Sequence, residues 1–208
     1  MSSSNHSAGP WIAVVLSLSL AGCGGHPSSA AAPSTAPTTQ GDNVKTELAT
    51  FAMGCFWGSQ ATFDKIPGVV RTTVGFEGGK TPNPTYRDVC TDRTGYAEVV
   101  QVEFDPAKVT YQKLLEVFFE NHDPTTLNRQ GPDSGTQYRS AVFIHNPQQE
   151  KLAAAEKEKR DKSGDYVGPI VTEIEPAGAF YKAEDYHQEY FKKNGEDYAC
   201  HLGNGKKK

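Results

Sequence analysis

Charge is distributed along this 208-residue chain so unevenly that only its later part can form a folded core. Met1 to Gly41 contain no acidic or basic side chain, whereas all 21 Lys and Arg and all 25 Asp and Glu lie from Asp42 onward. Gly24 to Asn43 are rich in Ala, Ser, Thr and Pro and contain no large apolar residue. Such a segment cannot bury enough surface to offset the entropy of ordering it. We therefore expect one folded domain over residues 44–208, preceded by a flexible linker over residues 23–43.

The start of the chain has the pattern of a targeting segment. Trp11 to Leu20 form a short apolar run, and a membrane-spanning helix needs about 20 apolar residues, so the run suits a secretory signal better than a span. The next residues, Leu20-Ala21-Gly22-Cys23, resemble the bacterial lipoprotein signal, in which the Cys is lipidated and cleavage occurs before it. A short buried helix is the alternative, but the segment that follows cannot pack against it. Met1 to Pro10 lack the Lys or Arg that such signals usually carry.

This pattern predicts a signal peptide over residues 1–22 and a lipid on Cys23. The protein would then be exported and anchored to the bacterial cell envelope, on its periplasmic face, by the lipid alone. Gly24 stands where an Asp would favour retention in the inner membrane, so the sequence favours the outer membrane where the cell has one.

Composition excludes several classes of protein. The net charge is −4, and Lys and Arg do not cluster as they do in nucleic-acid-binding domains. Four cysteines are too few for a small domain held together by disulfides. With 20 Gly and 13 Pro, the chain does not have the composition of a plain helical bundle.

The body has alternating strand and helix patterns. Strands are predicted at 46–53, 69–76, 97–104, 138–145 and 170–176. Helices are predicted from 55 to 63, 110 to 122 and 147 to about 163. The second helix has an apolar stripe at i, i+3, i+4 and i+7 spacing, and the third begins with Asn146 as its cap, Pro147, and Gln149 to complete a capping box. The order predicts an α/β (α+β) two-layer sandwich with a ferredoxin-like split β-α-β core, a mixed sheet and a long irregular C-terminal tail.

Cys55 is the first candidate for chemistry, in the segment Gly54-Cys55-Phe56-Trp57-Gly58. It lies between a predicted strand end and a predicted helix start, where backbone N–H groups and the helix dipole stabilise a thiolate. The two adjacent aromatic rings suggest a small hydrophobic pocket. The alternative is an inert Cys buried in an aromatic core, which is the common fate of an unpaired Cys.

Glu98 is the second candidate. In the predicted strand Ala97–Phe104, the alternation puts Glu98 on the same face as Val100, Val102 and Phe104. A carboxyl on an apolar face loses hydration, which favours its protonated form and suits a general acid. The alternative is a solvated Glu98 at a frayed strand start.

Five blocks in a fixed order now support a family resemblance. They are Gly54-Cys55-Phe56-Trp57-Gly58, Tyr86-Arg87-Asp88-Val89-Cys90, Gly95-Tyr96-Ala97-Glu98-Val99-Val100, Asp133-Ser134-Gly135-Thr136-Gln137-Tyr138-Arg139-Ser140 and Tyr186-His187-Gln188. Together they closely resemble the A-type peptide methionine sulfoxide reductases, from about Thr46 to about Leu202. The resemblance implies thiol-dependent reduction of protein-bound and free methionine-S-sulfoxide to methionine, and hence repair of oxidised proteins.

The resemblance also implies a role for each site residue. Cys55 would attack the sulfoxide sulfur and become a sulfenic acid, while Glu98 would protonate or hydrogen-bond the sulfoxide oxygen. Tyr86 and Tyr138 would donate hydrogen bonds to the same oxygen. Asp133 would help to position water and the local backbone. Phe56 and Trp57 would hold the methionine methyl group. It implies no cofactor and no metal, a thioredoxin or a similar reductant as partner, and a monomer.

Two cysteines could resolve the sulfenic acid. Cys200 lies in a Gly- and Asn-containing tail that could reach Cys55, and it is favoured because the resemblance implies that a Cys at position 90 does not serve as the resolving thiol. Cys90 is interpreted as a buried small residue. The approach Asn194 to Cys200 differs from the family's usual Asn-Pro-Asn-Gly-Tyr-Cys pattern. Tyr96 stands where the family often has His, which should affect a neighbouring contact and leave the acid itself in place.

Two other classes of function are compatible with parts of the sequence. Cys55 with His122 or His187 could form a Cys–His acyl-transfer enzyme, provided that the base reaches the thiol. A lipoprotein binding module could use the Phe56 and Trp57 pocket only to hold ligands. His122, His187 and His201 are scattered, and no C-x-x-C pair accompanies them, so a zinc site is not indicated.

Overall fold

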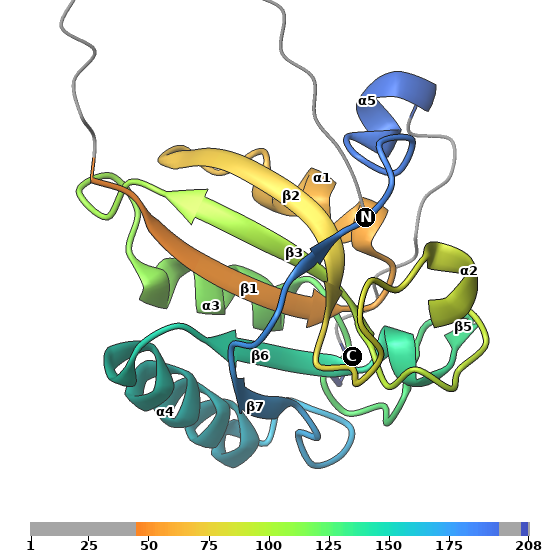
Figure 1. Ribbon diagram of the computed structural model, residues 1–208. Coiled ribbons are helices and arrows are strands. Elements are labelled where there is room, and N and C mark those ends of the chain that lie inside the picture. Colours follow the sequence, from red (N-terminus) through yellow and green to blue (C-terminus); the bar gives the residue numbers. More distant parts are fainter. Residues whose placement is uncertain (1–44, 196–204, 208) are drawn as a thin grey trace, which may run out of the picture. The chain divides into compact units, whose positions relative to one another are not determined.

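The computed structural model describes residues 45–195 and 205–207, and its centre is a six-stranded mixed sheet in the order β7-β6-β1-β3-β2-β8 (Figure 1). The strands of this sheet are β1 (Glu47–Met53), β2 (Val69–Glu77), β3 (Ala97–Phe104), β6 (Ser140–Ile144), β7 (Glu173–Pro176) and β8 (Tyr181–Lys182). A separate hairpin pairs β4 (Arg129–Gln130) with β5 (Asp133–Ser134). The helices are α1 (Phe56–Phe63), α2 (Tyr86–Val89), α3 (Tyr111–Glu120), α4 (Pro147–Ser163) and α5 (Tyr190–Asn194), with a 3-10 turn, η1, at Thr136–Tyr138.

The sheet contains two interleaved split β-α-β units. β3 lies between β1 and β2 and is antiparallel to both, while α1 connects these two outer strands. β1 lies in the same way between β3 and β6, which α3 connects. The predicted ferredoxin-like core of an α/β sandwich is therefore confirmed. Because β1 and β3 are neighbouring antiparallel strands, the C-terminal end of β1 and the start of β3 lie side by side at the same end of the sheet.

The two faces of the sheet are covered differently. On one face, α1 and α3 pack against the sheet through large apolar side chains. The ring of Phe51 on β1 stacks on that of Phe63 at a centroid distance of 5.0 Å and on that of Phe118 at 5.4 Å. The other face carries small residues such as Ala52 and is covered by the segment between β7 and β8, which crosses the sheet in Figure 1. The large side chains thus support α1, the helix that begins next to Cys55.

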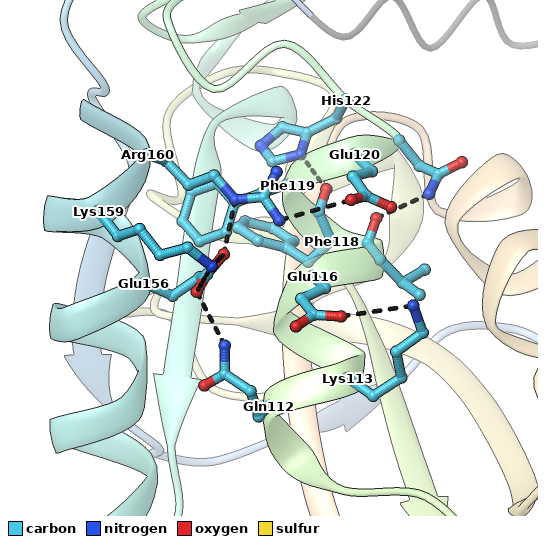
Figure 2. A network of polar contacts seen from close by, with 12 residues as sticks. Gln112, Lys113, Glu116, Phe118, Phe119, Glu120, His122, Glu156, Lys159 and Arg160 are labelled. Carbon is cyan, nitrogen blue, oxygen red and sulfur yellow. Dashed lines mark hydrogen bonds and ion pairs between the residues drawn. The ribbon is translucent and has the colours of Figure 1, made fainter. Parts of the chain in front are cut away.

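Buried polar contacts hold α4 against α3 (Figure 2). Glu156 is 2 % exposed and accepts hydrogen bonds from Gln112 of α3 at 2.8 Å and from Arg160 at 2.6 Å. Burial raises the pKa of Glu156, but its hydrogen bonds to Arg160, Lys159 and Gln112 outweigh this and leave it below the ordinary value. α4 carries few large apolar residues, and the contacts of Glu156 with Gln112 and of Arg160 with Glu120 of α3, at 3.6 Å, add to its packing.

Several details differ from the sequence prediction. Tyr138 lies in η1 instead of β6, because the segment turns there to bring its side chain toward the end of the sheet. The tail predicted as irregular contains β8 and α5, which are too short to show a period. Asn146 caps α4 as predicted, but Gln149 accepts from the N–H of His145 instead of that of Asn146.

Two groups of predictions lie outside the described residues. The signal peptide over 1–22, Cys23 and the whole linker over 23–43 belong to the first group, and Cys200 and His201 to the second. None of the helices in the described ranges has both the length and the apolar character of a membrane span.

Glu77 supplies a prediction about stability. It is 1 % exposed at the end of β2, and its Oε1 accepts the N–H of Gly178 at 2.7 Å. Burial raises its pKa to about 7, the Gly178 hydrogen bond opposes the rise, and Glu175 adds to it. Because the pKa of Glu77 is higher in the folded than in the unfolded chain, its contribution to the free energy of unfolding is fully present below about pH 4.5. This contribution is lost as the pH rises through 7. We expect Glu77→Gln to raise the free energy of unfolding by about 2 kcal/mol at pH 8 and by much less at pH 5.

Urea denaturation at the two pH values measures this difference. Glu47→Gln, at an exposed Glu on β1, is the matched control and should change neither value. An equal effect of Glu77→Gln at pH 5 and pH 8 would contradict the pKa assignment.

Candidate active site

Cys55 occupies the turn between β1 and α1 and is the N-cap residue of α1. Gly54 before it has φ +90°, and a Cβ there would lie 2.5 Å from Cγ of Gln130, so only glycine fits. The N–H groups of the first helical turn and the positive end of the helix dipole therefore lie next to Cys55, which is partly buried. The local geometry predicted for a reactive thiol is present.

Glu98 lies at the start of β3 and is only 2 % exposed. Its neighbour across the strand is Phe76 of β2, and its Oε2 accepts the backbone N–H of Phe56 at 3.0 Å. Phe56 is the first residue of α1, directly after Cys55. The carboxyl therefore faces the same helix N-terminus as the thiol, and the alternative of a solvated, frayed Glu98 is wrong.

A cavity of about 370 Å³ joins these two groups to the other predicted side chains. Its lining consists of Cys55, Phe56, Trp57, Tyr86, Glu98, Asp133, Tyr138 and Tyr190. Seven of these eight residues were predicted from the sequence. Tyr190 was not, because it lies in the tail where no periodic pattern marks it.

Tyr86 and Tyr138 bring hydroxyl groups to the cavity from α2 and η1. Burial raises the pKa of each hydroxyl well above its ordinary value, and Glu98 would raise it further whenever its carboxyl is ionised. Both tyrosines therefore remain protonated near neutral pH and can donate hydrogen bonds to an oxygen in the cavity. Tyr138 and Cys55 line the same cavity.

Asp133 reaches the cavity from the β4–β5 hairpin, and burial raises its pKa. The hairpin is fixed by Gln130, whose side chain accepts the N–H of Asp123 at 3.1 Å and contacts Gly54. The same residue thus positions both Asp133 and the turn that carries Cys55.

The apolar wall of the cavity consists of Phe56 and Trp57, with ring centroids 6.4 Å apart. Tyr190 of α5 stacks on Trp57 at 3.8 Å with an interplanar angle of 9°. Trp57 also donates its indole N–H to Nδ1 of His187 at 3.0 Å. The wall thus depends on two residues from the C-terminal segment.

His122 does not act as a base for Cys55 in this structure. It is fully buried, its Nδ1 is 2.6 Å from the carbonyl oxygen of Phe118, and its Nε2 is 2.7 Å from Oγ of Ser140. Burial lowers its pKa to about 4, although the Phe118 contact opposes the shift. With both ring nitrogens engaged elsewhere, His122 has a structural role. His187 does not line the cavity that contains Cys55, and its Nδ1 accepts the indole N–H of Trp57. The structure thus gives no support to a Cys–His acyl-transfer enzyme based on either residue.

Cys90 is exposed at the end of α2, so its interpretation as a buried small residue is wrong. The short helix α2 presents Val89 to the core and leaves Cys90 at the surface, within hydrogen-bond reach of the Tyr86 hydroxyl. Tyr96 is buried behind the site, against Gly79, and its hydroxyl donates to the carbonyl of Thr81. It does not line the cavity, as expected for a residue that leaves the acid in place.

Within residues 45–195 and 205–207, no group of three His, Cys, Asp or Glu side chains is arranged to hold a metal ion. The ionisable side chains that line the cavity are one thiol, two carboxyls and three phenols.

Comparison with known proteins gives a consistent result. Residues 47–208 match the family model described as peptide methionine sulfoxide reductase. The peptide methionine sulfoxide reductase MsrA of Methanoculleus marisnigri is 61 % identical over 149 residues, which are 72 % of this chain and 91 % of the relative. The corresponding protein of Geobacter sulfurreducens is 55 % identical over 155 residues, 74 % of this chain and 96 % of the relative.

Two solved structures are similar to this one. Reduced Mxr1 of Saccharomyces cerevisiae has a TM-score of 0.69 at 43 % identity and covers 76 % of this chain and 91 % of its own. Methionine sulfoxide reductase A of Corynebacterium diphtheriae has a TM-score of 0.67 at 42 % identity and covers 81 % and 85 %.

Proposed function

Because the chain belongs to the A-type peptide methionine sulfoxide reductase family and is a thiol-dependent reductase of methionine-S-sulfoxide, we propose that Cys55 is its nucleophile. The observation that carries this proposal is the hydrogen bond from the Phe56 N–H to Glu98, which holds a carboxyl and a thiol at the same helix N-terminus. A nucleophile and an acid are the two groups that reduction of a sulfoxide by a thiol requires.

In the proposed first step, the Cys55 thiolate attacks the sulfoxide sulfur and a proton reaches the sulfoxide oxygen. The attack forms a bond between Sγ of Cys55 and the methionine sulfur. The oxygen then passes to Sγ as the S–O bond and this S–S bond break, so that methionine leaves and Cys55 becomes a sulfenic acid. One sulfur is reduced by two electrons and the other is oxidised by two, so the step needs no cofactor. Helix N–H groups stabilise the attacking thiolate.

Glu98 supplies the proton, and the hydroxyls of Tyr86 and Tyr138 donate hydrogen bonds to the same oxygen. All three line the cavity, and both phenols remain protonated near neutral pH. Asp133, on the cavity wall, positions water. The rings of Phe56 and Trp57 bind the methyl group of methionine, since a methyl group gains free energy by leaving water for an apolar wall.

The direct test is reduction of N-acetyl-methionine sulfoxide by the purified chain with dithiothreitol. We expect turnover of the S epimer and none of the R epimer. Absence of turnover with either epimer would favour an acyl-transfer enzyme or a binding module instead.

Cys200 is the proposed resolving thiol, although it lies outside the described residues. Its thiol would attack the sulfenic acid, releasing water and forming a Cys55–Cys200 disulfide. A dithiol of the thioredoxin type would then reduce this disulfide by exchange. The proposal rests on the position of Cys200 in the sequence, five residues beyond the described segment that ends at Gly195.

Cys200→Ser should therefore release about one methionine per enzyme and then stop when thioredoxin is the reductant. Cys90→Ser is the matched control and should keep multiple turnover. For both variants, methionine release is measured in single-turnover and in steady-state assays. Continued turnover of Cys200→Ser with thioredoxin, together with its loss in Cys90→Ser, would make Cys90 the resolving thiol.

We also propose that the enzyme is a monomer tethered to the cell envelope by a lipid on Cys23, and thus repairs exported proteins. The support is the apolar run followed by Leu20-Ala21-Gly22-Cys23 and the linker after it. Mass spectrometry of the mature amino terminus tests the anchor. An N-terminal diacylglyceryl-Cys23 is expected, and a chain that still begins at Met1 would contradict it.

A further inference from the structure

His187 is a buried histidine that the proposed chemistry does not use. It is 1 % exposed and does not line the cavity, yet its ring lies 5.1 Å from that of Phe56 and 4.3 Å from that of Tyr86. It also accepts the indole N–H of Trp57 at 3.0 Å. One imidazole thus contacts three of the rings that form the site.

The contact with Trp57 fixes the protonation state of His187. An indole nitrogen can only donate, so Nδ1 of His187 must be an unprotonated acceptor and Nε2 must carry the hydrogen. Burial lowers the pKa of His187, against an opposing effect of Glu184, which is consistent with a neutral ring. Nε2 is buried without a hydrogen-bond partner among the described residues. The single acceptor nitrogen of the His187 ring, Nδ1, is therefore occupied by the indole N–H of Trp57.

The backbone around His187 is fixed to two elements of the core. The side chain of Gln188 accepts the N–H of Val74 at 3.0 Å and donates to the carbonyl of Val74 at 2.9 Å, which joins it to β2. The N–H of Glu189 donates to Oε1 of Gln60 on α1 at 2.7 Å. Both anchors directly follow His187 in the sequence, so its acceptor is held in place relative to α1.

We propose that His187 is a positioning residue that sets the orientation of Trp57 and so shapes the methyl-binding wall of the cavity. Tyr190 restrains one face of the indole by stacking, and His187 restrains its edge by the hydrogen bond. Without the acceptor, the indole N–H would lose its buried partner, and the ring would rotate to find another. The inference rests on the proposed function only in assigning the wall to the methyl group.

Three substitutions separate positioning from general support of the fold. His187→Asn places an amide oxygen near the position of Nδ1, whereas His187→Gln places its amide near Nε2 and His187→Leu has no acceptor. We expect Leu and Gln to raise KM for N-acetyl-methionine-S-sulfoxide about tenfold with kcat within about threefold, since one hydrogen bond to the wall is lost. The Asn variant should restore KM to within about threefold of the wild-type value.

The indole N–H resonance of Trp57 in a proton–nitrogen NMR spectrum provides a readout that does not depend on activity. The chain has two tryptophans; Trp11→Phe identifies the Trp11 signal in the unprocessed chain, whereas a chain that begins at Cys23 contains Trp57 alone. The Trp57 resonance should be protected from solvent exchange in the wild type and in His187→Asn, and should shift and lose protection with Leu or Gln. If His187→Leu does not fold, the comparison of His187→Asn with His187→Gln still tests the proposal.

The inference is overturned if the Trp57 resonance is the same in the Asn and Gln variants. It is also overturned if these variants lower kcat equally and leave KM unchanged, which is the result for a residue that only supports the fold. A wild-type protein that does not reduce sulfoxide but shows the expected resonance changes would refute the proposed function and keep the positioning of Trp57.

Discussion

Cys55→Ser is expected to abolish the reduction of methionine sulfoxide, lowering kcat by roughly 10⁴-fold or more. A hydroxyl at the N-cap of α1 does not ionise near neutral pH, so the helix N–H groups that stabilise a thiolate have no anion to stabilise. The serine hydroxyl also contains no sulfur, so it cannot take up the sulfoxide oxygen to form a sulfenic acid. Serine is a good N-cap residue, so the fold should remain.

Single-turnover methionine release and labelling of sulfenic acid with dimedone measure the effect. With Cys200→Ser, which leaves the sulfenic acid unresolved, the substrate-treated chain should incorporate the label at residue 55, and the double variant Cys55→Ser/Cys200→Ser should incorporate none. Cys90→Ser makes the same chemical change at an exposed thiol that does not line the cavity and should keep kcat within about threefold. Turnover by Cys55→Ser together with its loss in Cys90→Ser would move the nucleophile to Cys90.

The parts of the site that lie in regular elements could be predicted from the sequence. The strict alternation of β3 placed Glu98 on the core face, and the structure confirms its burial. The glycines around Cys55 indicated a tight turn between a strand and a helix, and Gly54 does require its positive φ. In both cases a local rule decides the side-chain direction, so one sequence is enough.

The parts that depend on contacts between distant segments were not predicted. Tyr190 and His187 contact Trp57 across more than a hundred residues, and the short elements β8 and α5 that carry this segment to the site have no period to read. His187 was interpreted as a scattered residue for the same reason. Cys90 was assigned to the interior because a typical unpaired Cys is buried, whereas α2 has only four residues and places Val89 inward instead.

Glu98→Gln is expected to lower kcat by about 10²- to 10⁴-fold, the range lost when a positioned acid is removed. The amide oxygen of glutamine can still accept the Phe56 N–H that Glu98 accepts at 3.0 Å, so the start of α1 should stay in place. What glutamine cannot do is transfer a proton to the sulfoxide oxygen. KM should therefore change by less than about threefold, since Phe56 and Trp57 still bind the methyl group.

The rate of methionine release in the first turnover is the decisive measurement for Glu98→Gln, because it excludes the resolving and recycling steps. Glu103→Gln provides a matched control on the same strand. Glu103 lies at the far end of β3, where it pairs with Arg71 at 2.7 Å near the surface, and its removal should leave the rate within about twofold. If Glu98→Gln retained the wild-type first-turnover rate, the carboxyl would only cap α1. The tyrosine hydroxyls, protonated near neutral pH and facing the same cavity, would then be the source of the proton. A slow first turnover with unchanged KM assigns the proton to Glu98, because uniform loss of binding would raise KM instead.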